Sequence, residues 1–333
     1  MTIHWYPGHM HKAQKEMIEL LPQVDLLIEI LDARIPWSSE NPAIARLRGD
    51  TPCIKVLSKS DLADPKVTAL WQARFEQQRN VKTFPTRSDQ PAGIQALQGL
   101  CRAMVPKRNS NKNQIHAMVV GIPNVGKSTL INILAGRAIA KTGDEPAVTK
   151  GQQRINLGND ITLFDTPGIL WPKVENPASS YRLAVTGAIR DTAMAYDDVA
   201  HFAAEFLLHN YPDLLVERFK LDVVPHDEEA FLQAAALKRG AIGAGGKFNR
   251  HKISELLVKE FRSGKLGRIS LETPAMIEQE LIVMNHTAAR QAEDKAARKQ
   301  RFKEGSGSLD KKERKQMRVD KQAARKPKPT TKR

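Results

Sequence analysis

Short apolar runs alternate with amphipathic stretches over the first half of the chain. The runs have the length and the β-branched content of buried strands: Val24–Asp32 (VDLLIEILD), Cys53–Ser58 (CIKVLS), Val81–Pro85, His116–Gly121, Ile155–Leu157 and Ile161–Asp165. Helical spacing separates them at Met10–Leu21, Asp64–Gln78, Pro91–Met104 and Lys127–Ala135. The last two strands form a predicted hairpin, because Gly158-Asn159 between them is a turn sequence. This alternation predicts an α/β domain with a largely parallel sheet over residues 1–175.

The pattern changes to helical spacing alone after residue 175. The segments that show it are Ser179–Arg190, Asp198–His209, Pro212–Phe219, Asp227–Leu237, Lys252–Arg262 and Pro274–His286. Because no strand interrupts them, we expect an all-α domain over residues 176–285.

Charge is unevenly distributed along the 333 residues, which carry a net charge of +15. Residues 286–333 hold 17 Lys and Arg against 6 Asp and Glu, so most of the surplus lies there. This segment cannot bury a core, and we expect a flexible basic tail that becomes helical only on binding. Its single aromatic residue, Phe302, argues against recognition by base stacking. Neutralisation of RNA phosphates is the favoured interpretation, and the alternatives are a merely solvated charge run or attraction to a membrane surface.

The sequence indicates a cytoplasmic protein without membrane insertion. Its first residues lack the apolar core of a signal peptide, and no apolar run approaches the ~20 residues that span a bilayer. The two cysteines, Cys53 and Cys101, form neither a CxxC motif nor a Cys/His cluster, so we expect no disulfide framework or structural zinc. Nothing indicates a heptad seam, and we expect a monomer.

A phosphate-binding loop is predicted at Gly121–Ser128 (GIPNVGKS), which fits GxxxxGK[ST] between an apolar strand and an apolar helix. Glycines let backbone N–H groups approach phosphates, and the helix N-terminus adds positive potential. Lys127 is expected to contact the β- and γ-phosphates, and Ser128 is expected to bind Mg²⁺. The predicted contacts with the nucleotide also include Asn124, Val125, Gly126 and Thr129.

Two further segments complete the predicted phosphate side. Asp165–Gly168 (DTPG) ends a strand, where Asp165 is expected to hold Mg²⁺ through water and the Gly168 N–H to contact the γ-phosphate. Thr149 lies in a polar loop between the two motifs and is the candidate for a switch threonine on Mg²⁺. An ordinary loop threonine is the alternative.

A guanine-binding motif is predicted before the phosphate motifs. Ser58–Asp61 (SKSD) is similar to the [NT]KxD motif, in which the Asp carboxylate accepts hydrogen bonds from guanine N1–H and N2–H, a pairing that adenine cannot offer. Lys59 is expected to pack along the base, while Ser58 keeps a hydroxyl in place of an amide. Thr86-Arg87 stands where GTPases usually carry Ser-Ala. Taken alone, SKSD could be a helix cap.

The motif order resembles that of the circularly permuted GTPases. Other residues carrying the resemblance, which covers residues 3–285, are Trp5–Met10 (WYPGHM), Asp32–Pro36 (DARIP) and Gly264–Ile269 (GKLGRI). Within that group the chain resembles the ribosome biogenesis GTPase A family. The resemblance implies a circularly permuted P-loop GTPase domain followed by an all-α domain and a basic tail. It implies GTP and GDP as ligands, and assistance in late assembly of the bacterial large (50S) subunit.

The partners implied by this resemblance are the large-subunit precursor, rRNA and ribosomal proteins, with slow intrinsic hydrolysis stimulated by the particle. An rRNA-binding scaffold that holds GTP as a structural ligand is the alternative. In Gly264–Ile269, the cations could contact rRNA or cap the preceding helix.

The phosphate and guanine motifs quoted above contain no residue that is expected to orient the attacking water. Ile169 follows DTPG, where Ras-type enzymes place a water-orienting glutamine, and an isoleucine cannot orient water. The resemblance implies that His9 supplies the missing group. Lys127 is the other residue expected to act in catalysis. The alternative for His9 is that it merely begins a helix. The resemblance also implies K⁺ at Asn124, and a loop asparagine that bonds its own backbone is the equal alternative.

Overall fold

The computed structural model describes residues 8–87, 90–105, 114–140, 153–158, 160–170, 174–243 and 246–307, with side chains except at 8, 9, 91 and 301–307. The chain divides into two units, Met1–Ile277 and Glu278–Arg333. The α/β and helical regions therefore lie in one unit, and their division near residue 175 stays a prediction from the sequence.

The first unit contains a six-stranded sheet with the order β3-β2-β1-β4-β6-β5. The strands are β1 (Leu26–Asp32), β2 (Cys53–Ser58), β3 (Val81–Pro85), β4 (Ile115–Gly121), β5 (Gln153–Asn156) and β6 (Ile161–Asp165). All neighbours are parallel except β5 and β6, which form the predicted antiparallel pair. Every residue of β1 and β2 is buried, as expected for strands covered on both faces.

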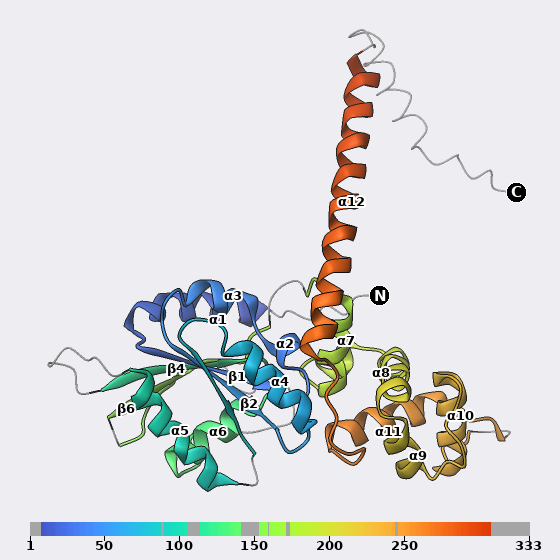
Figure 1. Ribbon diagram of the computed structural model, residues 1–333, viewed down its shortest axis with the longest axis horizontal. Coiled ribbons are helices and arrows are strands. Elements are labelled where there is room, and N and C mark those ends of the chain that lie inside the picture. Colours follow the sequence, from blue (N-terminus) through green and yellow to red (C-terminus); the bar gives the residue numbers. More distant parts are fainter. Residues whose placement is uncertain are drawn as a thin grey trace, which may run out of the picture. The chain divides into compact units, whose positions relative to one another are not determined.

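Helices cover both faces of this sheet. They are α1 (Gly8–Leu20), α2 (Pro36–Ser39), α3 (Pro42–Leu47), α4 (Pro65–Phe75), α5 (Pro91–Met104) and α6 (Lys127–Ala135), with a 3₁₀ turn η1 (Leu21–Gln23). In Figure 1, α5 and α6 lie together on one side and α1 and α3 lie on the other. Proline begins α2 to α5, where its missing N–H and fixed φ are tolerated, and the side chains of Asn41 and Asp64 cap α3 and α4.

The helical region follows β6 in the chain. It comprises α7 (Pro177–Thr186), η2 (Asp191–Ala193), α8 (Tyr196–Asn210), α9 (Pro212–Phe219), α10 (Glu228–Lys238) and α11 (Arg250–Arg262). Helix α8 packs against α7, α9, α10 and α11 (Figure 1). Its fully buried Ala200, Ala204 and Leu207 belong to the hydrophobic core that also includes the sheet.

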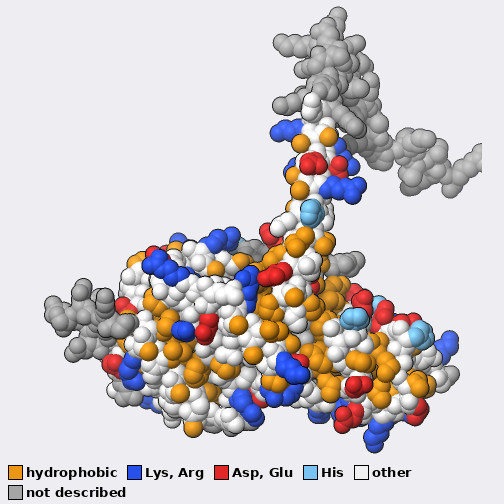
Figure 2. All heavy atoms as spheres, in the orientation of Figure 1, with side chains coloured by type: hydrophobic (Ala, Val, Ile, Leu, Met, Phe, Trp, Pro, Cys, Tyr) orange, Lys and Arg blue, Asp and Glu red, His pale blue; other side chains and the backbone are white. Residues whose placement is uncertain are grey.

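The last helix is longer than the sequence predicts. Helix α12 runs from Pro274 to Gly307, so the segment after His286 begins as a helix instead of as a flexible tail. It ends inside the predicted Gly305–Ser308 break, and residues 308–333 lie outside the described residues. Side chains from Asn285 to Gln300 are exposed, and Lys and Arg are interspersed there with acidic residues (Figure 2). Helix formers such as Ala and Arg explain the helix without a buried face. No described helix is long and apolar enough to cross a membrane.

Candidate nucleotide-binding site

The predicted P-loop connects the end of β4 to the start of α6. Gly121 is required at the strand end, because a Cβ there would lie 2.8 Å from the Ile30 carbonyl oxygen of β1. Gly126 has φ +93° and is the residue before α6, so the chain enters the helix through a conformation that favours glycine. The first N–H groups of α6, which include those of Ser128 and Thr129, have no partners inside the helix. This helix end is suited to bind phosphate.

Lys127 and Asp165 form a buried ion pair at the same end of the sheet. Their side chains are 6% and 0% exposed, and Lys127 Nζ donates to Asp165 Oδ1. Burial raises the pKa of Asp165 and lowers the pKa of Lys127, since it disfavours both charges. Asp165 Oδ2 is buried and unpaired within the part of the chain that the structure describes. A buried carboxylate oxygen without a partner suits Mg²⁺, which prefers oxygen ligands.

The DTPG segment is hydrogen-bonded to the end of β4, where the P-loop begins. Thr166 Oγ1 donates to the Val119 carbonyl (2.8 Å), and Ile169 N–H donates to the Gly121 carbonyl (3.1 Å). A Cβ on Gly168 would lie 3.0 Å from Pro123 Cα, so only glycine fits without a shift. Ile169 is 5% exposed and belongs to the core, so it has no access to a reacting water.

The predicted base motifs lie beside the P-loop, as the permuted order requires. Ser58 Oγ lies 2.9 Å from the Leu31 carbonyl oxygen and 2.5 Å from that of Val125. The hydroxyl has one proton to donate to these two acceptors, whereas the amide of an asparagine has two. Lys59 has φ +56°, and its Nζ donates to the Asn124 carbonyl (2.7 Å).

The two base loops also contact each other. Ser60 N–H donates to the Thr86 carbonyl (3.1 Å), and Ser60 Oγ donates to the same oxygen (3.0 Å). Thr86 is buried and Arg87 is exposed. Asp61 Oδ1 is buried and has no hydrogen-bond partner among the described residues. It belongs to the carboxylate that the sequence predicts as the acceptor for guanine N1–H and N2–H.

Asp32 and Arg34, at the end of β1, support this site, and no nucleotide motif in the sequence points to them. Arg34 Nε and Nη2 donate to the two Asp32 carboxylate oxygens at 2.9 and 2.8 Å, and Lys59 Nζ donates to Asp32 Oδ2 at 3.1 Å. Burial by itself would raise the pKa of Asp32, but the charges of Arg34 and Lys59 outweigh it and lower that pKa. The DARIP sequence was the only available signal.

Of the remaining residues predicted for the site, the structure places some and does not describe others. Asn124 Nδ2 donates to the Gly187 carbonyl at the end of α7 (2.8 Å), a partner that neither sequence interpretation included; K⁺ at this position stays a prediction. Val125 is buried in the core, and Thr129 is half-buried on α6. Thr149 lies outside the described residues. His9 lies in the first turn of α1, and its side chain is also outside them.

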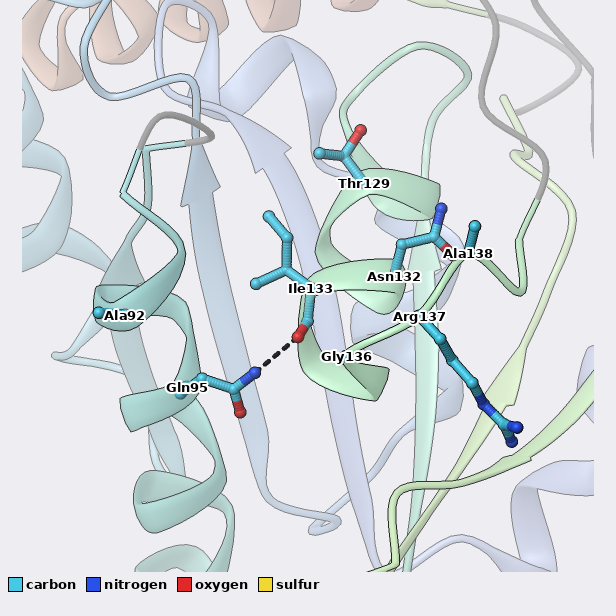
Figure 3. Close-up of a pocket in the computed structure, with 8 residues that line it drawn as sticks. All are labelled: Ala92, Gln95, Thr129, Asn132, Ile133, Gly136, Arg137 and Ala138. Atoms are coloured by element: carbon cyan, nitrogen blue, oxygen red, sulfur yellow. Dashed lines mark hydrogen bonds between the residues drawn. The ribbon is translucent and has the colours of Figure 1, made fainter.

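A hollow of about 490 Å³ lies between α5 and α6, farther along α6 from its N-terminus. Figure 3 shows its lining, where Gln95 of α5 donates to the Ile133 carbonyl of α6 (2.6 Å). Of the predicted site residues, only Thr129 is among those that line it. The hollow is thus separate from the loops that carry the phosphate and base motifs.

The chain is similar to known GTPases. Residues 116–217 match the family described as 50S ribosome-binding GTPase. The chain is 42% identical over 281 residues to Ribosome biogenesis GTPase A of Bacillus pumilus, covering 82% of this chain and 99% of that protein. It is 43% identical over 291 residues to the protein of that name from Priestia megaterium, covering 84% and 100%.

Two solved structures are also similar to this chain. A GDP-bound structure of YlqF matches with a TM-score of 0.55 and 25% identity, covering 78% of this chain and 99% of that one. A GNP-bound YlqF from T. maritima matches with the same TM-score and identity, covering 79% and 98%.

Proposed function

This chain belongs to the ribosome biogenesis GTPase A family, and we propose that it hydrolyses GTP during late assembly of the large ribosomal subunit. GTPase chemistry and a role in ribosome biogenesis follow from the family. The proposal adds the large subunit, a slow intrinsic rate and stimulation by the particle. The observation that supports it best is the meeting of the two motif sets, with Asp61 Oδ1 and Asp165 Oδ2 each buried without a partner among the described residues.

Each motif then has a separate task in hydrolysis. The α6 N-terminus and Lys127 would hold the β- and γ-phosphates, and Ser128, Thr149 and Asp165 would hold Mg²⁺. When bound there, Mg²⁺ would neutralise charge on the phosphate oxygens. Asp61, Lys59 and the Thr86-Arg87 loop hold the guanine. Water attacks the γ-phosphorus, the bond from that phosphorus to the β–γ bridging oxygen breaks, and GDP and phosphate leave.

His9 completes this proposal as the group that orients the attacking water. Its imidazole can accept a proton. It lies next to Met10, whose side chain is fully buried and fixes this part of α1 to the core. A ribosomal partner that contacts α1 could therefore place His9 for catalysis. This arrangement would explain slow hydrolysis by the free protein.

The binding surface that we propose for rRNA is the helical region together with the basic C-terminal segment. Support comes from the description of the matched family as ribosome-binding and from the charge surplus of residues 286–333. Among residues with described side chains, Arg290, Lys295, Arg298 and Lys299 are exposed on α12. Binding through them should weaken steeply with salt, since each neutralised phosphate releases counterions.

The test is steady-state GTP hydrolysis by the full chain in K⁺ buffer, alone and with purified large or small ribosomal subunits. We expect a large increase with the large subunit only, and its loss in His9→Ala. His11→Ala is the matched control, because it makes the same change two residues farther along α1. Stimulation by the small subunit instead would contradict the proposed partner, and an unaffected His9→Ala would contradict the catalytic assignment.

A scaffold role is the second candidate, and the burial of Ile169 favours it. If large subunits bind the protein while turnover stays at the basal rate, GTP acts as a structural ligand. The same experiment distinguishes the two functions, since only the first predicts stimulated phosphate release.

A further inference from the structure

The loop that carries the guanine motif is held by a distant segment of the helical region. We call residues Ser58–Asp64 the guanine loop and residues Gly264–Ser270 the clamp segment. The clamp segment begins two residues after α11 ends at Arg262. It contains the GKLGRI sequence. Its contacts differ from both interpretations of that sequence, in which the cations contact rRNA or cap the preceding helix.

Four hydrogen bonds join the clamp segment to the guanine loop. Arg268 Nη2 donates to the Ser60 carbonyl and Arg268 Nε to the Ala63 carbonyl, both at 3.1 Å, so the guanidinium bridges the two sides of Asp61. Between them, Ile269 N–H donates to the Leu62 carbonyl at 2.9 Å. Beyond them, Asp64 N–H donates to Ser270 Oγ at 3.2 Å. These contacts hold the backbone on both sides of the carboxylate that would read the base.

The end of α11 fixes the clamp segment in this position. Gly264 has φ +73°, its N–H donates to the Phe261 carbonyl (3.1 Å), and Lys265 N–H donates to the Glu260 carbonyl (3.0 Å). This is a glycine C-cap, made by the backbone and not by the cations of the clamp segment. A Cβ on Gly264 would lie 2.6 Å from Leu62 Cδ2, so the guanine loop packs directly against the capped turn.

We propose that Arg268 is a positioning residue for guanine recognition: through the Ser60 and Ala63 carbonyls it holds the loop in the conformation that points Asp61 at the base. The inference rests on the proposed function, since it assigns a role within the same site. Its chemical basis is that the planar guanidinium binds two carbonyls in a fixed geometry, which an ammonium cannot reproduce. Guanine selectivity is then a joint property of the α/β and helical regions.

The test compares Arg268→Ala, Arg268→Lys and the wild-type full chain in binding to mant-GDP, with GDP, inosine diphosphate and ADP as competitors. Lys265→Ala is the matched control, because it removes an exposed cation from the same segment without a side-chain contact to the guanine loop among those described. For Arg268→Ala we expect about tenfold weaker GDP binding. The preference for GDP over inosine diphosphate should shrink, because that analogue lacks the 2-amino group that Asp61 accepts.

The selectivity ratio distinguishes positioning from folding, because partial unfolding lowers the active concentration for all nucleotides alike. Arg268→Lys should fall between the other two, and KM for GTP should rise in Arg268→Ala while kcat at saturation stays near wild type. A folded Arg268→Ala with wild-type GDP affinity and selectivity would overturn the inference and leave the proposed function intact. Failure of the wild-type chain to prefer GDP over ADP would instead overturn the proposed function.

Discussion

On the phosphate side of the site, the binding residues come from one strand–loop–helix unit and the adjoining strand β6. The P-loop follows β4, α6 follows the P-loop, and DTPG is hydrogen-bonded to the backbone of β4. On the base side, β2 supplies the guanine loop, but its supports lie far away in the chain, at Asp32, Asn124 and Arg268. The phosphate motifs are therefore carried mostly by adjoining elements, whereas the base side depends on tertiary contacts, one of which, through Arg268, comes from the helical region.

Removing the P-loop lysine should have the largest effect and should leave base selectivity unchanged. Lys127→Ala takes away the cation that neutralises the phosphates, and we expect kcat for GTP to fall by about 10²- to 10³-fold. Steady-state phosphate release measures this fall, with the exposed Lys66→Ala as control. A changed ratio of GDP to inosine diphosphate affinity in Lys127→Ala would show that the phosphate side and the base side do not act independently.

Replacing Asp61, the carboxylate proposed to read guanine, should alter the base side alone. Asp61→Asn loses the ionised acceptor, and we expect GDP to bind about 100-fold more weakly while xanthosine diphosphate binds better. Competition against mant-GDP measures both affinities. Asp50→Asn is the control, since the Asp50 side chain is 83% exposed. Equal GDP affinity in wild type and Asp61→Asn would exclude Asp61 as the base reader.

Ser58 belongs to the guanine loop and contacts the P-loop, so removing its hydroxyl should slightly weaken binding of both the base and the phosphates. Ser58→Ala deletes the hydroxyl that reaches the Leu31 and Val125 carbonyls, a loss of about 1 kcal/mol or about fivefold in nucleotide affinity. GDP and inosine diphosphate should weaken by the same factor, as isothermal titration calorimetry would show. A selective loss of GDP would mean that Ser58 acts on the base side only.

An effect of similar size, on stability instead of binding, is a pH dependence that belongs to the base side. Because the pKa of Asp32 is lowered in the folded state, its contribution is present above the unfolded pKa of 3.8 and is lost as pH falls below it. Between pH 6 and pH 3, wild type should therefore lose about 1 kcal/mol more unfolding free energy than Asp32→Asn. Urea titrations at each pH measure the difference, and parallel pH profiles would contradict it.

Much of the fold could be predicted from the sequence, because its elements carry local signals. The bounds of β2, β3 and α6 are those that apolar runs and the GKS sequence predict. The circularly permuted fold is confirmed by the similarity to YlqF. Helix α12 was predicted too short, since helix-forming residues can continue a helix without the apolar periodicity on which the prediction depended.

The supports of the base side could not be predicted in the same way. Arg268 binds backbone carbonyls, and a carbonyl has no residue type that would mark it in a sequence. The Asn124 side chain likewise meets the Gly187 carbonyl, so its partner follows only from the packing of α7 on the P-loop. Motifs identify the groups that contact a ligand, whereas the groups that hold them depend on tertiary structure.

Because we propose that the chain hydrolyses GTP during assembly of the large ribosomal subunit, we expect the nucleotide at this site to govern attachment to that subunit. The most direct test is co-sedimentation of the full chain with purified large and small subunits, in the presence of a non-hydrolysable GTP analogue or GDP. We predict retention on the large subunit with the analogue and release with GDP. Equal retention with both nucleotides, or retention on the small subunit, would contradict the account.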